Sequence, residues 1–235
     1  MSESAPTSAT SNGPSIPSVK PHSQRLHVRR LPGLTNYQQS WQAMQDYTRE
    51  RNADSSDQLW LLQHPPVFTL GKAGRAEHLL APGDIEVVHV DRGGQVTYHG
   101  PGQIVAYPML DLHRLGIGIR SLVTLIEQAI IDTLADYGVA SERLQGAPGV
   151  YHPQGKIAAL GLRVSRGCTF HGLAFNVDMD LSPYQRINPC GYAGMAVTDC
   201  RRVGIEAPVS EIEDRLAGHI AGLLNYTALV HSELL

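Results

Sequence analysis

A lysine and a cysteine in the second half of the chain have surroundings that suit acyl-transfer chemistry. Lys156 opens an apolar, strand-like run that ends at Gly161, and Cys190 follows 34 residues later between a proline and a glycine. A thiol held beside an amine can form an acyl-enzyme and pass the acyl group on. Taken alone, such a lysine is more often a solvent-facing strand residue, and a lone cysteine is more often buried and inert. The loop context of Cys190 favours the reactive interpretation, because a nearby ammonium group raises the thiolate fraction of a cysteine.

A glycine-rich segment upstream of this pair has the composition of a ligand-binding loop. It reads Arg92-Gly93-Gly94-Gln95-Val96-Thr97-Tyr98-His99-Gly100-Pro101-Gly102-Gln103. Glycine lets the backbone approach a ligand closely, and exposed amides in such turns can hold an oxyanion or a phosphate. The alternative is two tight turns that flank an edge strand. The order GxxxxGK[ST] of a phosphate-binding P-loop does not occur in this segment.

The remaining cysteines and the histidines give weaker signals. Cys168 and Cys200 are interpreted as structural, and three cysteines in 235 residues do not suggest a disulfide framework. We therefore expect a reducing, cytoplasmic location. His64 and His171 either line a pocket or pack in the core. Because no HxxxH, HExxH or CxxC spacing occurs, we expect neither a metal site nor a cofactor.

Composition indicates one globular domain that follows a disordered tail. Apolar residues make up 42% and charged residues 17% of the chain, with a net charge of -3, so nothing suggests nucleic-acid binding. No run approaches the roughly 18 apolar residues that cross a membrane. Residues 1–25 are rich in Ser, Thr and Pro and lack a signal-peptide core. We expect this tail to be disordered and residues 26–235 to form the catalytic domain.

The hydrophobic pattern predicts an α+β fold. Helical spacing occurs in 37–48 and 119–134, and again after Ser210, which forms a capping box with Glu213. Short strand-like runs cover 59–62, 66–70, 85–90, 104–110 and 169–177, and the runs 150–152 and 156–164 resemble a hairpin. Because short turns join most of these runs, we expect a mixed or antiparallel sheet with flanking helices, gathered on one side.

Four segments together resemble the lipoyl(octanoyl) transferases. They are RGGQVTYHGPGQ, GKIAALGLRV, HGLAFNVDMDL and INPCG with the following GMAVT, in the order of that family. The similarity runs from about His27 to about Leu224. It implies a fold like the catalytic domain of biotin and lipoate protein ligases. It also implies transfer of an octanoyl group from octanoyl-acyl carrier protein to a lysine of a lipoyl domain, in the 2-oxoacid dehydrogenase complexes or in the glycine cleavage H protein.

The resemblance also implies roles for individual residues. The nucleophilic cysteine of the family falls on Cys190 and its acid/base lysine on Lys156. At Ala159 relatives often carry serine, so any hydrogen bond from that hydroxyl is missing here. The substrate-binding segments of the family fall on Arg92, Gly93, Gly94, Gln95, Val96, Thr97, Tyr98 and His99, on Ala159, Leu160 and Gly161, and on Gly172, Leu173 and Ala174.

The resemblance leads to two further expectations, about the acyl chain and about the carrier protein. Tyr98, Leu160 and Leu173 line an apolar slot for the acyl chain. The acidic carrier protein docks on a patch formed by Arg163, Arg166, Arg201 and Arg202, unless these are scattered, solvated side chains.

Three other functions compete with the transferase. An ATP-dependent lipoate or biotin protein ligase shares the fold but needs an adenylate-binding apparatus, which the sequence does not reveal. A cysteine thioesterase forms the same acyl-enzyme and hands it to water. A non-catalytic module that binds lipoyl domains has no need for Cys190 beside Lys156.

Overall fold

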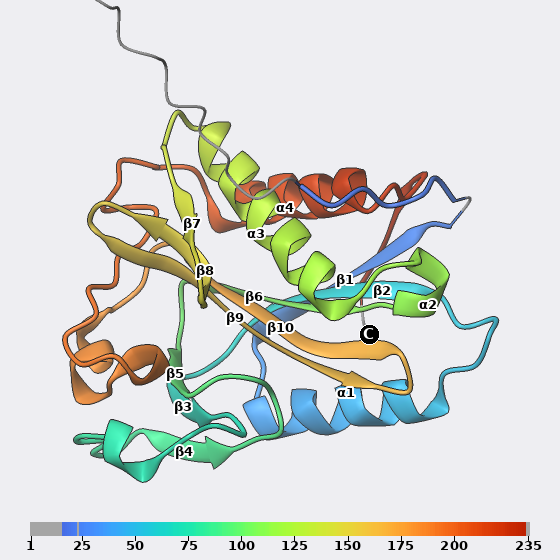
Figure 1. Ribbon diagram of the computed structural model, residues 1–235. Helices are drawn as coiled ribbons and strands as arrows, with labels where there is room; N and C mark the ends of the chain where they lie inside the picture. The colour runs from blue at the N-terminus through green and yellow to red at the C-terminus, as the bar shows by residue number, and fades with distance from the viewer. Residues whose placement is uncertain (1–15, 23, 234–235) are drawn as a thin grey trace, which may run out of the picture.

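A large mixed β-sheet forms the framework of the protein (Figure 1). The computed structural model describes residues 16–22 and 24–233. The large sheet has the strand order β11-β1-β2-β6-β10-β9-β8-β7, and a small sheet has the order β4-β3-β5. The strands are β1 (Leu26–Leu34), β2 (Asp57–Gln63), β3 (Val67–Leu70), β4 (Glu86–His89), β5 (Val96–His99), β6 (Gln103–Met109), β7 (Glu142–Leu144), β8 (Ala147–His152), β9 (Gly155–Ser165), β10 (Cys168–Asn176) and β11 (Leu229–Glu233). The helices are α1 (Tyr37–Glu50), α2 (Leu112–Leu115), α3 (Ile119–Ala135) and α4 (Val209–Leu223), with short 3₁₀ turns η1 (Ala76–His78), η2 (Ser182–Arg186) and η3 (Pro189–Gly191).

Helices cover both faces of the large sheet, so the prediction that they gather on one side is wrong. Helices α3 and α4 lie on one face, and α1 lies on the other (Figure 1). Strand β6 explains why, since every residue in it is buried. Ile104 and Ala106 join the core under α3 and α4, whereas Val105 and Tyr107 join a second core with Met44 of α1. A strand covered on both faces reads as a continuous apolar run.

The mixed-sheet prediction and the predicted hairpin are confirmed. Strand β1 pairs in parallel with β2 and β11, and β3 pairs in parallel with β4. All other pairings between the named strands are antiparallel, including β8 with β9 and β9 with β10. In the β9–β10 ladder, Ala159 lies opposite Ala174 and Gly161 lies opposite Gly172.

Helix α1 begins at Tyr37, as the helical spacing predicts, but α4 does not begin as predicted. The side chain of Asn36 accepts a hydrogen bond from the amide of Gln39 at 3.1 Å and caps α1. The predicted capping box at α4 is wrong, because the helix begins at Val209 and Ser210 already lies in its first turn. Glu213 is turned toward the sheet instead, where its carboxylate lies 3.5 Å from Arg30 Nε on β1.

The residues just before β1 lie against the domain rather than forming part of a free tail. Val19 is buried in the main core, and His22 Nε2 lies 2.9 Å from the carbonyl of Leu224. The predicted disordered tail of residues 1–25 therefore extends too far, because residues within 16–22 pack on the domain. Residues 1–15 of the predicted tail lie outside the described part of the chain. The division into one catalytic domain from residue 26 stays a prediction. Within the described ranges, no helix has both the length and the apolar character needed to span a bilayer.

Candidate active site

The structure brings the side chains of Lys156 and Cys190 into contact. Lys156 Nζ lies 3.0 Å from Cys190 Sγ, within hydrogen-bonding distance for sulfur. Lys156 is the second residue of β9, and Cys190 occupies the centre of the short turn η3. Cys190 has a φ of +57°, a left-handed conformation that is uncommon outside glycine. Such strain often accompanies a side chain that a turn presents for chemistry.

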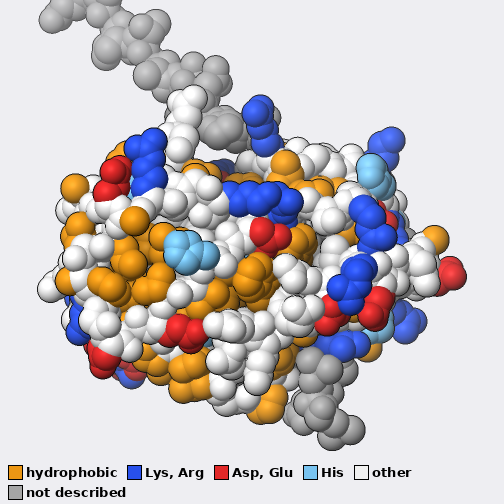
Figure 2. All heavy atoms as spheres, turned by 90° about the horizontal axis from the view of Figure 1, so that it is seen from below, with side chains coloured by type: hydrophobic (Ala, Val, Ile, Leu, Met, Phe, Trp, Pro, Cys, Tyr) orange, Lys and Arg blue, Asp and Glu red, His pale blue; other side chains and the backbone are white. Residues whose placement is uncertain are grey.

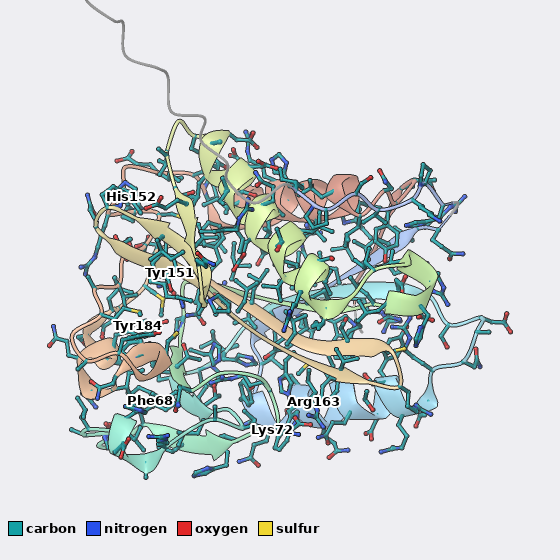
Figure 3. All side chains as sticks on the ribbon, viewed as in Figure 1. Phe68, Lys72, Tyr151, His152, Arg163 and Tyr184 are labelled. Atoms are coloured by element: carbon teal, nitrogen blue, oxygen red, sulfur yellow. The ribbon has the colours of Figure 1, made fainter. Side chains whose placement is uncertain are left out.

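The ammonium group of Lys156 is held on three sides. Besides the sulfur, Nζ donates to the carbonyl of Pro148 at 2.8 Å and lies 5.1 Å from the centre of the Tyr151 ring. Lys156 is only 4% exposed. Gly149 makes this position possible, because a Cβ there would lie 2.5 Å from Lys156 Cε and 2.9 Å from Nζ. Figure 3 shows Tyr151 on β8, at the side of the molecule where the loops that contain Tyr184 and η3 meet the sheet.

The chain that follows Cys190 runs back along β9. The amide of Lys156 donates to Ala196 O at 2.9 Å, and the amide of Thr198 donates to Lys156 O at 3.0 Å, so Val197 forms a parallel bridge with Lys156. Gly155 permits this close approach, since a Cβ there would lie 2.6 Å from Ala196 O. The backbone of the lysine is thus joined directly to the segment that carries the cysteine.

A cavity extends from Cys190 along the face of the sheet that α1 covers. Small residues make room for it, because the cross-strand pairs Ala159–Ala174 and Gly161–Gly172 lie along it. Their neighbours Leu160 and Leu173 pack in the main core. Alternation along the strands directs the small side chains toward the face that α1 covers, and the two leucines border the cavity as well.

The cavity is bordered by buried polar groups as well. Arg92 donates to Thr69 O at 2.6 Å and to Gly93 O at 2.8 Å, and burial lowers the pKa of its guanidinium. His171 Nε2 lies 2.9 Å from Asp91 Oδ1, and burial lowers the pKa of the imidazole. A neutral ring that donates through Nε2 has an acceptor at Nδ1, which has no hydrogen-bond partner among the described residues.

Comparison with known proteins identifies the family. The family model named lipoyl protein ligase A/B catalytic domain matches residues 36–221. The octanoyltransferase of Shewanella amazonensis is 58% identical over 208 residues, which cover 88% of this chain and 96% of that protein. The octanoyltransferase of Cellvibrio japonicus is 61% identical over 195 residues, covering 83% and 91% of the two chains. The chain belongs to the octanoyltransferase family.

Solved structures confirm the fold predicted for a member of this family. A putative lipoate protein ligase from Thermoplasma acidophilum with bound lipoic acid matches with a TM-score of 0.71 at 16% identity, covering 91% of this chain and 90% of that one. The biotin protein ligase of Aquifex aeolicus, in complex with biotin and ATP, matches with a TM-score of 0.51 at 12% identity, covering 85% and 70%. At such identities the likeness establishes the α+β architecture alone.

Most of the residues that the octanoyltransferase resemblance predicts as substrate-binding do border the cavity. Gly93 is an exception, because it borders a neighbouring pocket that also reaches Cys190. Tyr98 borders neither pocket, so the prediction that it lines the acyl slot is wrong. It packs with Phe68 and Tyr184 in a separate core, because strand alternation places it opposite to its neighbours. The predicted residues that border the cavity are Arg92, Gly94, Gln95, Val96, Thr97, His99, Ala159, Leu160, Gly161, Gly172, Leu173, Ala174 and Cys190.

The four arginines predicted as one docking patch form two separate pairs. Arg163 and Arg166 lie at the β9–β10 hairpin, while Arg201 donates its amide to Val177 just past the other end of β10. About seven strand residues separate the pairs, which is on the order of 20 Å. Arg163, Arg201 and Arg202 each have a carboxylate within 4 Å. On the face seen in Figure 2, basic side chains are likewise interspersed with acidic ones.

The other two cysteines lie in settings that suppress reactivity. Cys200 is fully buried, and burial raises the pKa of its thiol far above the usual range. Burial also raises the pKa of Cys168. Among the described cysteines, Cys190 is the one whose sulfur lies within hydrogen-bonding distance of a cationic side chain. In the described part of the chain, no three His, Cys, Asp or Glu side chains are grouped as metal ligands.

Sequence reasoning missed three polar residues near the site. Tyr37 and Tyr107 border the cavity, and burial raises the pKa of Tyr37 to about 12. Both occur in apolar patterns that indicate packing only, so nothing in their spacing reveals the cavity. Glu127 did have a signal, because a carboxylate among the buried positions of 119–134 needs a partner.

Proposed function

We propose that this octanoyltransferase moves the acyl group from octanoyl-acyl carrier protein through a Cys190 thioester to a lysine of a lipoyl domain. The contact of 3.0 Å between Lys156 Nζ and Cys190 Sγ carries the proposal. It supplies a nucleophile and a proton carrier that touch each other beside a cavity with small side chains.

In the first half-reaction, the Cys190 thiolate attacks the carbonyl carbon of the donor thioester. The ammonium group of Lys156 stabilises the thiolate before the attack. When the tetrahedral intermediate collapses, the bond to the carrier sulfur breaks and Lys156 gives that sulfur a proton. One thioester replaces another, so the step is nearly balanced in free energy and needs no ATP.

In the second half-reaction, the neutral amine of the acceptor lysine attacks the acyl-Cys190 carbonyl. Lys156, left neutral by the first step, takes the proton that the attacking nitrogen loses. Cys190 leaves as a thiolate, an amide bond remains on the acceptor, and the ammonium–thiolate pair is restored.

The acceptor class also has support from the fold. One of the matching structures is described as a bipartite lipoate protein ligase and its E2 lipoyl domain from Thermoplasma acidophilum, with a TM-score of 0.70. We infer that lipoyl domains of 2-oxoacid dehydrogenase complexes, and the related glycine cleavage H protein, present their lysine at the Cys190 end of the cavity.

A two-stage mass-spectrometric experiment tests the proposal. Incubation with octanoyl-acyl carrier protein, without ATP, is expected to leave one octanoyl group on Cys190. Adding a lipoyl domain should then move that group to the acceptor lysine. Release of free octanoate at the same rate with and without the lipoyl domain would identify a thioesterase. A strict need for ATP and free octanoate would identify a ligase.

The small side chains in the cavity predict how chain length is set. Replacing Ala159 with leucine adds three carbons where β9 faces the cavity. Each buried methylene is worth about 0.8 kcal/mol, and overfilling costs about 1–3 kcal/mol. We expect Ala159→Leu to slow octanoyl transfer by about tenfold or more and butanoyl transfer much less. Acylation rates for both chain lengths, with the wild-type protein as control, provide the measurement. An equal loss for the two chains would contradict this assignment of the cavity.

A further inference from the structure

A buried carboxylate on α3 lies behind the catalytic lysine. Glu127 is 6% exposed, and its Oε1 accepts a hydrogen bond of 2.8 Å from the amide of Gly149. The charged groups that act on it are Arg143 of β7 and Lys156 of β9. Burial raises the pKa of this carboxyl, while the Gly149 amide and the two cations oppose that effect.

The peptide group between Pro148 and Gly149 connects Glu127 to Lys156. Its N–H donates to Glu127, and its C=O accepts from Lys156 Nζ at 2.8 Å. These two groups belong to one planar unit and point in opposite directions. Fixing the N–H therefore also fixes the direction of the carbonyl. Gly149, with a φ of +139°, gives this unit an orientation that other residues rarely adopt.

We propose that Glu127 is a positioning residue, which fixes the Pro148–Gly149 peptide so that its carbonyl holds Lys156 Nζ against Cys190 Sγ. The relay runs from α3 through β8 and β9 to the turn η3, with contacts of 2.8, 2.8 and 3.0 Å. The inference rests on the proposed function for its effect on catalysis. The contacts themselves can be tested without any acyl substrate.

Two substitutions separate the position of the oxygen from its charge. Glu127→Gln keeps an oxygen at the same reach and removes the charge. Glu127→Asp keeps the charge and withdraws the oxygen by one methylene. Tyr151, the other titratable group beside Lys156, is unchanged in both variants.

The readout is the rate at which iodoacetamide alkylates Cys190 at pH values from 6 to 9. Peptide mass spectrometry measures the extent of alkylation at each time point. This rate reports the thiolate that Lys156 stabilises. We expect Lys156→Met to slow alkylation at pH 7 about tenfold, the equivalent of one hydrogen bond to a charged group. Glu127→Asp should slow alkylation about three- to tenfold and make its pH profile resemble that of Lys156→Met. Glu127→Gln should stay within about twofold of the wild-type rate.

Several outcomes would overturn the inference. Wild-type alkylation in Glu127→Asp removes the positioning role, and a loss confined to Glu127→Gln would show that the charge alone matters. A loss in Glu127→Gln equal to that in Glu127→Asp also contradicts the proposal, because glutamine keeps the accepting oxygen. In a Lys156→Met background, Glu127→Asp should add nothing, and an additional loss there also contradicts the relay. If thermal melting shows that Glu127→Asp is not folded, Glu127→Met replaces it in the test, because methionine removes the accepting oxygen at similar side-chain volume.

The alkylation test is independent of the acyl-transfer route. If octanoyl transfer to a lipoyl domain fails in the wild-type protein while the alkylation rates follow the expected order, the proposed function is wrong and the relay stands. If transfer succeeds and the alkylation order fails, the proposed function stands and Glu127 has no part in it.

Discussion

Replacing Cys190 with alanine is expected to abolish octanoyl transfer, with a loss of at least about a thousandfold, because it removes the thiol that contacts Lys156. Cys190→Ser should lose nearly as much, since a serine hydroxyl needs a stronger base than a cysteine thiol does. Transfer to a lipoyl domain and the octanoyl adduct on the intact protein are the measurements. Neither variant should form the adduct.

Cys168→Ala and Cys200→Ala are the matched controls for this loss. Both remove a thiol whose pKa is raised by burial, so most of the transfer activity should remain. Cys200→Ala also leaves a small cavity in the core, and its melting temperature separates that effect from catalysis. Retained activity in Cys190→Ala, or its loss in Cys168→Ala, would place the acyl group on a different residue.

Replacing Lys156 with methionine is expected to slow both half-reactions by about a hundredfold or more, the range of general acid–base catalysis. The loss arises because one amine serves as the ammonium partner of Cys190 and later as the base for the acceptor. Single-turnover rates give acylation by the octanoyl carrier protein. Adding a lipoyl domain to the isolated acyl-enzyme gives the transfer step.

Lys156→Arg separates the two roles of the lysine. A guanidinium keeps the positive charge but does not lose its proton in proteins. Acylation should therefore survive in this variant better than transfer does. Equal rates of transfer in Lys156→Arg and in the wild type would show that another group takes the proton from the acceptor.

Local sequence signals were sufficient for the elements whose environment is uniform along the chain. Helix α1 follows from the spacing of residues that share one buried face. The hairpin of β8 and β9 follows from two apolar runs around a short turn. The capping box at Ser210 failed because Glu213 pairs with Arg30, a residue 183 positions away in the sequence. Long-range partners of this kind leave no periodic trace.

The pairing of Lys156 with Cys190 came from family resemblance, and the residue types alone left it open. The cavity could not be predicted, because it depends on the register that places Ala159 opposite Ala174. The role of Gly149 could not be predicted either, because it depends on the side chain of Lys156 lying directly against it. Residues that act by making room give no signal until the strands are aligned.

The bridge between Lys156 and Val197 closes a small ring. The ring runs from the lysine backbone to Val197, back along the chain to Cys190, and across the contact of sulfur with nitrogen. Within such a ring, the number of intervening residues limits where the sulfur can lie. Six residues separate Cys190 from Val197. Spacer length, together with the left-handed backbone at Gly191 and Gly194, therefore constrains the alignment of the two reacting groups.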